Sequence, residues 1–262
     1  MTQTPIDAAH AVMEAAPQDD AARLRFYERV ADSELFLLLT GEPEDDQIEP
    51  ELFELQDQKF VLAFDLEERL AGFVGRPAPY AGLSGRALAR MLAGQGVGLG
   101  LNLEVAPSSI LLPADAMVWL VDVLEQGPQQ GEANPESLAP PVGLPEVLLT
   151  SLDAKLAAAT GLARSAYLAQ VTYEGGAKGH LLGVTGAVAG AEAALAQAIN
   201  EALVFSGLEA GALDVTFIAD SDPLAAELAR VGLRFDLPEP EKPAEVERIA
   251  PGSDPEKPPI LR

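Results

Sequence analysis

The stretch RSAYLAQVTYEGGAKGHLLGVT, residues 164–185, holds two apolar runs that flank a glycine-rich turn. The runs, residues 164–173 and 180–185, contain the β-branched, aromatic and aliphatic side chains that strands favour. Three glycines in the intervening EGGAKG give the backbone the freedom that a tight turn requires. The stretch therefore predicts a β-hairpin.

Helical and strand patterns continue on both sides of this hairpin. Residues 145–159 place three leucines on one helical face, and residues 191–205 place aliphatic side chains at the same spacing. Residues 213–219 then alternate apolar side chains as a half-buried strand does, and a further helix and a short strand at 233–235 follow. Residues 146–236 are therefore expected to form one domain of order αββαβα(β).

Segments without apolar periodicity bound the predicted domains. Residues 126–145, QGPQQGEANPESLAPPVGLP, hold five prolines and predict an interdomain linker. Residues 237–262 are rich in proline and charge and predict a disordered tail, and residues 1–17 are interpreted as a flexible N-terminus. The first domain is then expected at residues 18–125.

Helix and strand signals also alternate in the first domain. Asp19 and Ser84 are suitable N-caps, a short helix is expected around residues 66–73, and Pro113 is suited to the start of a further helix. The runs at 35–39 and 60–64 predict buried strands. The fold class predicted for the chain is α/β (α+β), with two domains in which helices pack on mixed sheets.

Composition excludes several classes of partner. With 262 residues, 48% of them hydrophobic, the chain can build packed cores. Its 41 acidic and 17 basic residues give a net charge of −24, which repels nucleic acid and anionic lipid, so neither is expected as a partner. No apolar run approaches the roughly 20 residues that a bilayer-crossing helix needs. The first 17 residues contain no lysine or arginine, which argues against a signal peptide.

The sequence contains no catalytic or metal-binding constellation that we recognise. It has no cysteine, which removes thiolate chemistry and cysteine-based metal sites and fits a cytoplasmic location. Its two histidines are His10, in the predicted flexible N-terminus, and His180, at the start of a strand. The glycines of residues 94–100 follow a helix and precede a strand, the reverse of the order in a dinucleotide-binding turn. We expect no cofactor and no bound metal.

Two acidic segments leave alternatives open. Asp220 and Asp222 are spaced like a metal-binding pair, but Asp222 before Pro223 is also a typical helix N-cap. Residues 42–57, EPEDDQIEPELFELQD, hold eight acids and no base. This second segment is either a solvated loop with an edge strand or a docking face for a basic partner, with charges at Glu44, Asp45, Asp46 and Glu49.

The order and spacing of these elements resemble the SseB-like family, named for enhanced serine sensitivity. The stretches that carry the resemblance are RFY at 25–27, VLAF at 61–64, GRAL at 85–88, GLGLN at 98–102 and SAYL at 165–168. The resemblance implies an N-terminal SseB domain at 18–125, the family's C-terminal domain at 146–236, and a connection to serine tolerance. It implies no reaction and no ligating residue.

These observations predict a non-catalytic, cytoplasmic binding or regulatory protein whose partner is a protein, with a basic surface where it meets the acidic segment. The alternative is an enzyme that uses Asp, Glu, Ser or Arg side chains in a cleft of the first domain. Asp65, Arg86 and Asn102 would then be the first residues to examine, and they would have to converge in one pocket. The oligomeric state stays open.

Overall fold

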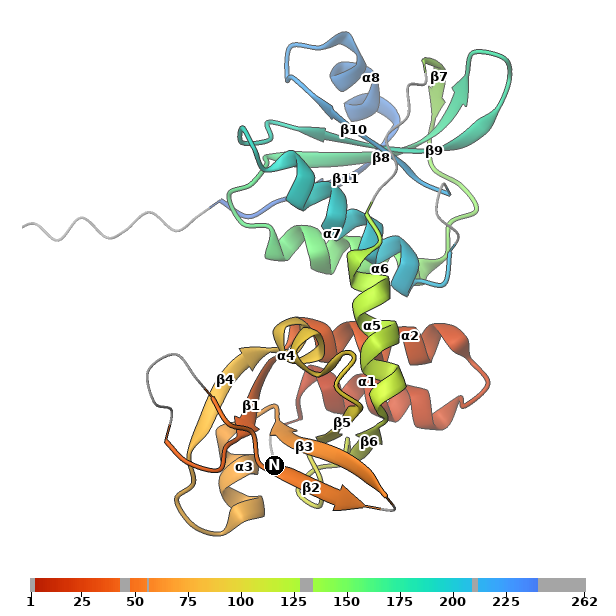
Figure 1. Cartoon of the computed structure of the whole chain (residues 1–262). Helices are drawn as coiled ribbons and strands as arrows, with labels where there is room; N and C mark the ends of the chain where they lie inside the picture. Colours follow the sequence, from red (N-terminus) through yellow and green to blue (C-terminus); the bar gives the residue numbers. More distant parts are fainter. Residues whose placement is uncertain (1–2, 43–47, 56, 128–133, 209–211, 240–262) are drawn as a thin grey trace, which may run out of the picture.

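The computed structural model describes residues 3–42, 48–55, 57–127, 134–208 and 212–239. These residues form two mixed sheets with helices packed on them, which confirms the predicted fold class (Figure 1). The elements of the first domain are α1 (Pro5–Ala15), α2 (Asp20–Asp32), β1 (Glu34–Leu38), β2 (Leu52–Leu55), β3 (Gln58–Phe64), α3 (Glu67–Val74), β4 (Tyr80–Ser84), α4 (Gly85–Leu92), β5 (Val97–Leu101), β6 (Ile110–Leu112) and α5 (Ala114–Glu125). Within the described ranges, no helix combines the length and apolar character needed to cross a membrane.

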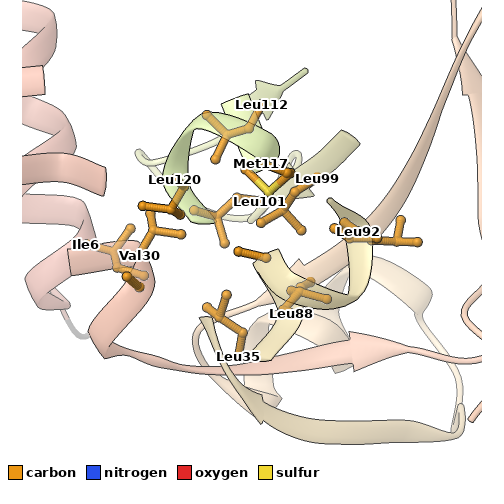
Figure 2. Close-up of a cluster of buried hydrophobic side chains, with 14 of the residues drawn as sticks. Ile6, Val30, Leu35, Leu88, Leu92, Leu99, Leu101, Leu112, Met117 and Leu120 are labelled. Carbon is orange, nitrogen blue, oxygen red and sulfur yellow. The ribbon is translucent and has the colours of Figure 1, made fainter. Parts of the chain in front are cut away.

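The first sheet has the strand order β4-β1-β3-β5-β6, and β2 also pairs with β3. Strands β3 and β5 are parallel, and the other pairs are antiparallel. On one face, the sheet shares a core with α1, α2, α4 and α5, in which Ile6, Val30, Leu88 and Leu120 meet (Figure 2). On the other face, α3 packs against a smaller cluster around Phe64.

The N-terminal segment is a folded helix, so the prediction that residues 1–17 are flexible is wrong for the part that the structure describes. The Thr4 hydroxyl accepts a hydrogen bond from the Asp7 backbone N–H at 3.2 Å, and the Asp7 carboxylate accepts one from the Thr4 N–H at 3.0 Å. This capping box satisfies two backbone donors that would otherwise lack partners. Ile6 is fully buried, and the His10 ring packs edge-on against Phe26.

The second domain contains the predicted hairpin at its centre. Its elements are β7 (Pro135–Ala139), α6 (Glu146–Ala158), β8 (Ser165–Tyr173), β9 (Lys178–Thr185), α7 (Glu192–Phe205), β10 (Asp214–Ile218), α8 (Pro223–Val231) and β11 (Leu233–Asp236). The strand order is β10-β9-β8-β11, with β7 also paired to β8. Helices α6 and α7 bury their leucines against one face of this sheet. Helix α8 contributes Leu228, which lies against Gly183 of β9.

Two segments predicted to lack structure take part in this domain. Strand β7 pairs with β8 inside residues 126–145, so the second sheet begins earlier than the predicted boundary at 146. Leu237 is buried, and its N–H donates to the Arg164 carbonyl at 3.3 Å, so the predicted tail of 237–262 starts as packed chain. Residues 240–262 lie outside the described ranges. Strand β7 is stabilised by its backbone pairing with β8, and this pairing cannot be predicted from the side-chain composition of residues 135–139.

Helix α4 starts in direct contact with α2, and this contact generates a prediction. The Gly85 N–H donates to the Ser33 carbonyl at 2.9 Å, and a Cβ at Gly85 would overlap the Val30 carbonyl oxygen. We expect Gly85→Ala to lower the free energy of unfolding by more than about 2 kcal/mol, because the helices would have to separate. Urea denaturation measures this loss.

The matched control is Gly72→Ala in α3, where the nearest atom to a new Cβ is 3.9 Å away. Here alanine should stabilise the helix by about 0.5–1 kcal/mol. Equal effects of the two substitutions would show that α4 does not approach α2 this closely.

Candidate functional site

A buried polar cluster lies at the carboxyl ends of the parallel strands β3 and β5. Open α/β sheets commonly place ligands at such ends, so this is the first place to look for chemistry. Asp65 follows β3, and its backbone N–H donates to Oδ1 of Asn102 at 3.1 Å. Asn102 follows β5 and is completely buried in a left-handed conformation with φ of 52°. Helix α1 is attached here as well, because the Thr4 hydroxyl donates to Oδ2 of Asp65 at 2.6 Å.

Arg69 of α3 connects the carboxylates of this cluster. Its Nη1 donates to Asp65 Oδ1 at 2.8 Å and to Asp7 Oδ1 at 3.1 Å, and its Nη2 donates to the other oxygen of Asp7. The Ser108 hydroxyl donates to Asp7 at 2.6 Å and accepts from the Asn102 amide at 2.9 Å. Across the described residues, each buried side-chain nitrogen and oxygen has a hydrogen-bond partner. The groups at these strand ends are therefore bonded to one another.

The electrostatics of the strand-end cluster favour a permanent ion pair. Burial alone would raise the pKa of Asp7, but hydrogen bonds from Arg69 and Ser108 outweigh it and hold that pKa well below its ordinary value. The pKa of Arg69 is raised: burial opposes the shift, and the two aspartates overcome it. Asp7 therefore stays ionised at neutral pH and cannot act there as a general acid. Its role is to fasten α1 to α3 and to the loop after β5.

A second, partly buried network joins the two domains. Arg86 of α4 makes a bidentate pair with Glu201 of α7, with nitrogen-to-oxygen distances of 2.7 and 2.6 Å, and also pairs with Asp32 of α2. Lys155 of α6 donates to Asp32 at 2.6 Å and to Glu201 at 3.0 Å. The pKa values of Asp32 and Glu201 are lowered, because Lys155 and Arg86 together outweigh the opposing effect of burial. Side chains from α2, α4, α6 and α7 thus form one interdomain ion network.

Glu28 of α2 completes this network as its least favourable charge. Its Oε1 accepts from the Ser151 hydroxyl at 2.9 Å and lies 3.6 Å from Nζ of Lys155. Burial raises the pKa of Glu28, and the attraction of Lys155 and the bond from Ser151 offset this only in part. Two cations therefore face three carboxylates at the interface.

Helix α7 also holds the end of α5. The Gln197 side chain donates to the Leu124 carbonyl at 2.8 Å, and the Asn200 side chain donates to the Gln126 carbonyl at 2.7 Å. Carbonyls at a helix C-terminus have no partner within the helix, so these amides serve as a C-terminal cap. Phe205 of α7 is buried in the core of the first domain. Figure 1 shows α6 and α7 between the second sheet and the first domain.

The three residues of the enzyme alternative fall into two networks. The structure brings Asp65 and Asn102 into one hydrogen bond, whereas Arg86 pairs with Glu201 and Asp32. The candidate metal pair is also separated by its contacts: Asp220 bonds Arg164 at 2.6 Å, and Asp222 caps α8 as predicted. Within the described ranges, no group of three His, Cys, Asp or Glu side chains is placed to hold a metal ion.

The comparisons with known proteins give one result. Residues 9–119 match the family model described as the SseB protein N-terminal domain. The matched part of the chain is therefore an SseB-like N-terminal domain. The matched region contains Asp65, Arg69 and Asn102, while Thr4 and Asp7 precede it. The comparisons with curated proteins and with solved structures gave no match.

The acidic segment of the SseB domain interrupts a strand. Strands β1 and β2 pair in line along β3, with Leu37 opposite Ala63 and Leu52 opposite Val61. The chain between them leaves the sheet at Leu39, which pairs with Pro50. Glu44, Asp45 and Asp46 lie outside the described residues. Glu49 is exposed, and its carboxylate accepts from the Thr40 hydroxyl at 3.1 Å.

Strand β2 is an edge strand of the SseB domain's sheet and carries exposed apolar side chains. Among the described elements it pairs with β3 alone. Leu52 is 53% exposed and Leu55 is 48% exposed, although leucine is usually buried. Glu54 and Asp57 are exposed beside them, and Glu51 is half-buried. We call residues 48–55 the acidic edge; sequence analysis predicted its charge but not its exposed leucines.

The described residues also line two surface clefts. One, of about 380 Å³, is lined by residues of the second domain that include Leu149 and Leu233. The other, of about 340 Å³, lies in the SseB domain and is lined by Lys59, Phe60 and Asp115 among others. Neither is lined by Asp65, Arg86 or Asn102.

The strand-end cluster predicts a pH-dependent stability difference for Asp7→Asn. We expect this substitution to lower the free energy of unfolding by about 3 kcal/mol at pH 7, because Arg69 loses a buried anionic partner. Since the folded pKa of Asp7 is depressed, its stabilising effect is full above about pH 4 and is lost as the pH falls further. Urea denaturation at pH 7 and pH 3 should show the difference shrinking. Glu14→Gln on the exposed face of α1 is the control and should change stability by less than about 0.5 kcal/mol.

The interdomain ion network predicts opposite effects for two of its carboxylates. Glu201→Gln should lower stability at pH 7 by about 3 kcal/mol, because Arg86 and Lys155 lose their shared partner. Glu28→Gln should leave stability unchanged or raise it by about 1 kcal/mol, because folding disfavours the ionised form of Glu28 and Gln still accepts from Ser151.

The stability of these two variants is also expected to depend on pH in opposite ways. Because the folded pKa of Glu28 is raised, any advantage of Glu28→Gln should appear as the pH rises above about 4 and be absent below it. The depressed pKa of Glu201 gives the reverse: its contribution is lost as the pH falls below about 4. Thermal melts between pH 3 and pH 7 measure both trends. Similar losses for both variants at pH 7 would contradict this account of the network.

Proposed function

We propose that this SseB-like protein is a non-catalytic, cytoplasmic binding or regulatory protein that recruits a protein partner with a basic surface. The single observation that carries the proposal is the acidic edge, where Leu52 and Leu55 are about half exposed beside Glu49, Glu51 and Glu54. Exposed apolar side chains surrounded by charge are characteristic of protein interfaces.

Charge and apolar surface serve different steps of such binding. The net charge of −24 gives the chain a long-range attraction for cations, and the acids of the edge direct a basic surface to this place. Burying the leucines then slows dissociation, at roughly 25 cal/mol for each Å² of apolar surface removed from water. Neither contribution requires a chemical step.

The state of the polar residues supports a non-catalytic role. Asp65 and Asn102 are engaged with Arg69 and Ser108, and Arg86 is engaged across the domain interface. A catalytic group needs access to substrate and a pKa suited to its task. The absence of cysteine is compatible with the cytoplasmic location that we propose. The connection with serine tolerance comes from the family name, and growth of a deletion strain on added serine tests it.

The proposal predicts that neutralising the acidic edge removes the partner. In the variant Glu49→Gln, Glu51→Gln, Glu54→Gln, the recovery of a stoichiometric partner by affinity capture from the protein's own cells should fall about tenfold, since long-range attraction is lost. Raising the salt should have the same effect on the wild type, because charges are screened over roughly 8 Å at physiological ionic strength. Quantitative mass spectrometry measures both results.

The matched control removes three acids from exposed positions of the second domain: Glu136→Gln, Asp153→Asn and Glu227→Gln. It changes the net charge by the same amount and should retain the partner. Equal recovery with the two variants would sink the proposal that the acidic edge is the binding surface.

A further inference from the structure

We infer that the outer edge of β2 binds an extended basic segment of the partner protein as an added strand of the first sheet. The inference rests on the proposed function and specifies how the acidic edge binds. Strand addition to an exposed edge is a common mode of peptide recognition, in which main-chain hydrogen bonds provide affinity and alternate side chains provide specificity.

The first sheet leaves a strand position open beside β2. Strands β1 and β2 lie in line on the same side of β3. The outer side of β1 is occupied by β4, whose pairing begins with Tyr80 opposite Leu38. At the next position the Leu39 N–H donates to the Pro79 carbonyl at 3.1 Å, and among the described strands none continues this row alongside Leu52–Leu55. An added strand would therefore lie in line with β4.

The side chains of β2 offer an incoming strand apolar contact on both faces. Successive strand residues point to opposite faces, so Leu52 and Glu54 share one face while Phe53 and Leu55 share the other. Phe53 is half-buried in the cluster below α3, and each face also carries an exposed leucine. This pattern differs from that of a protected edge strand, in which charge or proline replaces exposed apolar side chains.

Charge determines which kind of segment fits. Residues 49–59 carry four acids, Glu49, Glu51, Glu54 and Asp57, against the single base Lys59, which lies opposite Glu54 on β3. Opposite charges on neighbouring strands are favourable, and like charges are unfavourable. A segment that alternates basic and aliphatic residues therefore complements the edge.

The same charges disfavour a second copy of this chain as the occupant. Pairing two β2 edges would bring Glu51 and Glu54 of one copy against the same acids of the other, between two chains of net charge −24. The inference therefore commits to a basic partner segment.

The test uses two synthetic probes with equal charge. One is the blocked heptapeptide Lys-Val-Lys-Val-Lys-Val-Lys, and the other replaces each valine with proline, which cannot donate a main-chain hydrogen bond. We expect the valine peptide to bind the full chain about tenfold more tightly in calorimetric titration, which corresponds to about 1.4 kcal/mol. It should also slow hydrogen exchange of the backbone amides in Leu52–Leu55.

Protein variants separate the backbone contact from the charge. Leu52→Thr with Leu55→Thr keeps strand propensity but removes apolar surface, so it should weaken the valine peptide and leave the proline peptide unchanged. Val118→Thr, at an exposed position of α5, is the control and should affect neither peptide. Circular dichroism establishes that each variant is folded, and the comparison of the two peptides on the wild type does not depend on any variant.

The outcomes distinguish this inference from the proposed function. If both peptides bind the wild type equally and both weaken when Glu49, Glu51 and Glu54 are changed to Gln, the acidic edge binds cations and strand addition is overturned. If neither peptide binds, or if the affinity is unchanged when Glu49, Glu51 and Glu54 are replaced by Gln, the proposed function fails together with the inference. Sedimentation analysis could also show a dimer that dissociates in the Leu52→Thr, Leu55→Thr variant. A second copy of the chain would then occupy the β2 edge, and the inference of a basic partner segment would be overturned.

Discussion

The requirement that buried charges be paired determines much of this structure. Removing a charge from water costs several kcal/mol unless a partner and hydrogen bonds compensate. The pair between Arg86 and Glu201 meets this requirement only when the two domains are in contact, because the residues belong to α4 and α7. If the domains separated, Arg86 and Lys155 would lose their ion pairs with Glu201, and water would have to solvate each of these charges instead. The network therefore favours one arrangement of the two domains over others in which these charges would lack partners. The apolar contact of Phe205 with the core of the first domain further stabilises this arrangement.

The same requirement explains why the polar groups at the strand ends are bonded to one another. In many α/β proteins the carboxyl ends of parallel strands remain open to ligands. Here α1 folds across this position, and Asp7 forms an ion pair with Arg69 below the surface. The cluster gains rigidity, and Asp7 stays ionised near neutral pH. Surfaces outside the cluster differ from it in composition, and among them the acidic edge combines charge with exposed apolar side chains.

Much of the fold follows from local sequence, and the differences have identifiable causes. The hairpin of β8 and β9 and the caps at Ser84 and Asp222 were predictable, because turn and cap residues act on their immediate neighbours. Helix α1 carries an equally local signal, Thr4 followed by Asp7, which composition alone conceals. Strand β7 was not predictable, because its stability comes from β8, more than twenty residues away. Of the candidate site residues, the meeting of Asp65 with Asn102 could be expected from adjacent parallel strands. The pairing of Arg86 with Glu201 could not, since it depends on the docking of two domains.

The buried networks also affect how the surface charge should be understood. Together they pair five acids, Asp7, Asp65, Glu28, Asp32 and Glu201, with three bases, Arg69, Arg86 and Lys155. Their net charge is −2, so −22 of the formal −24 lies on the rest of the chain, because −24 minus −2 is −22. Three of the chain's 17 lysines and arginines are thus engaged in these networks, and two of them, Arg69 and Lys155, are buried. Self-association through an apolar edge on such a surface would have to overcome the repulsion between two negatively charged chains. The acids beside the exposed leucines of β2 would thus oppose the approach of another acidic surface and favour that of a basic one.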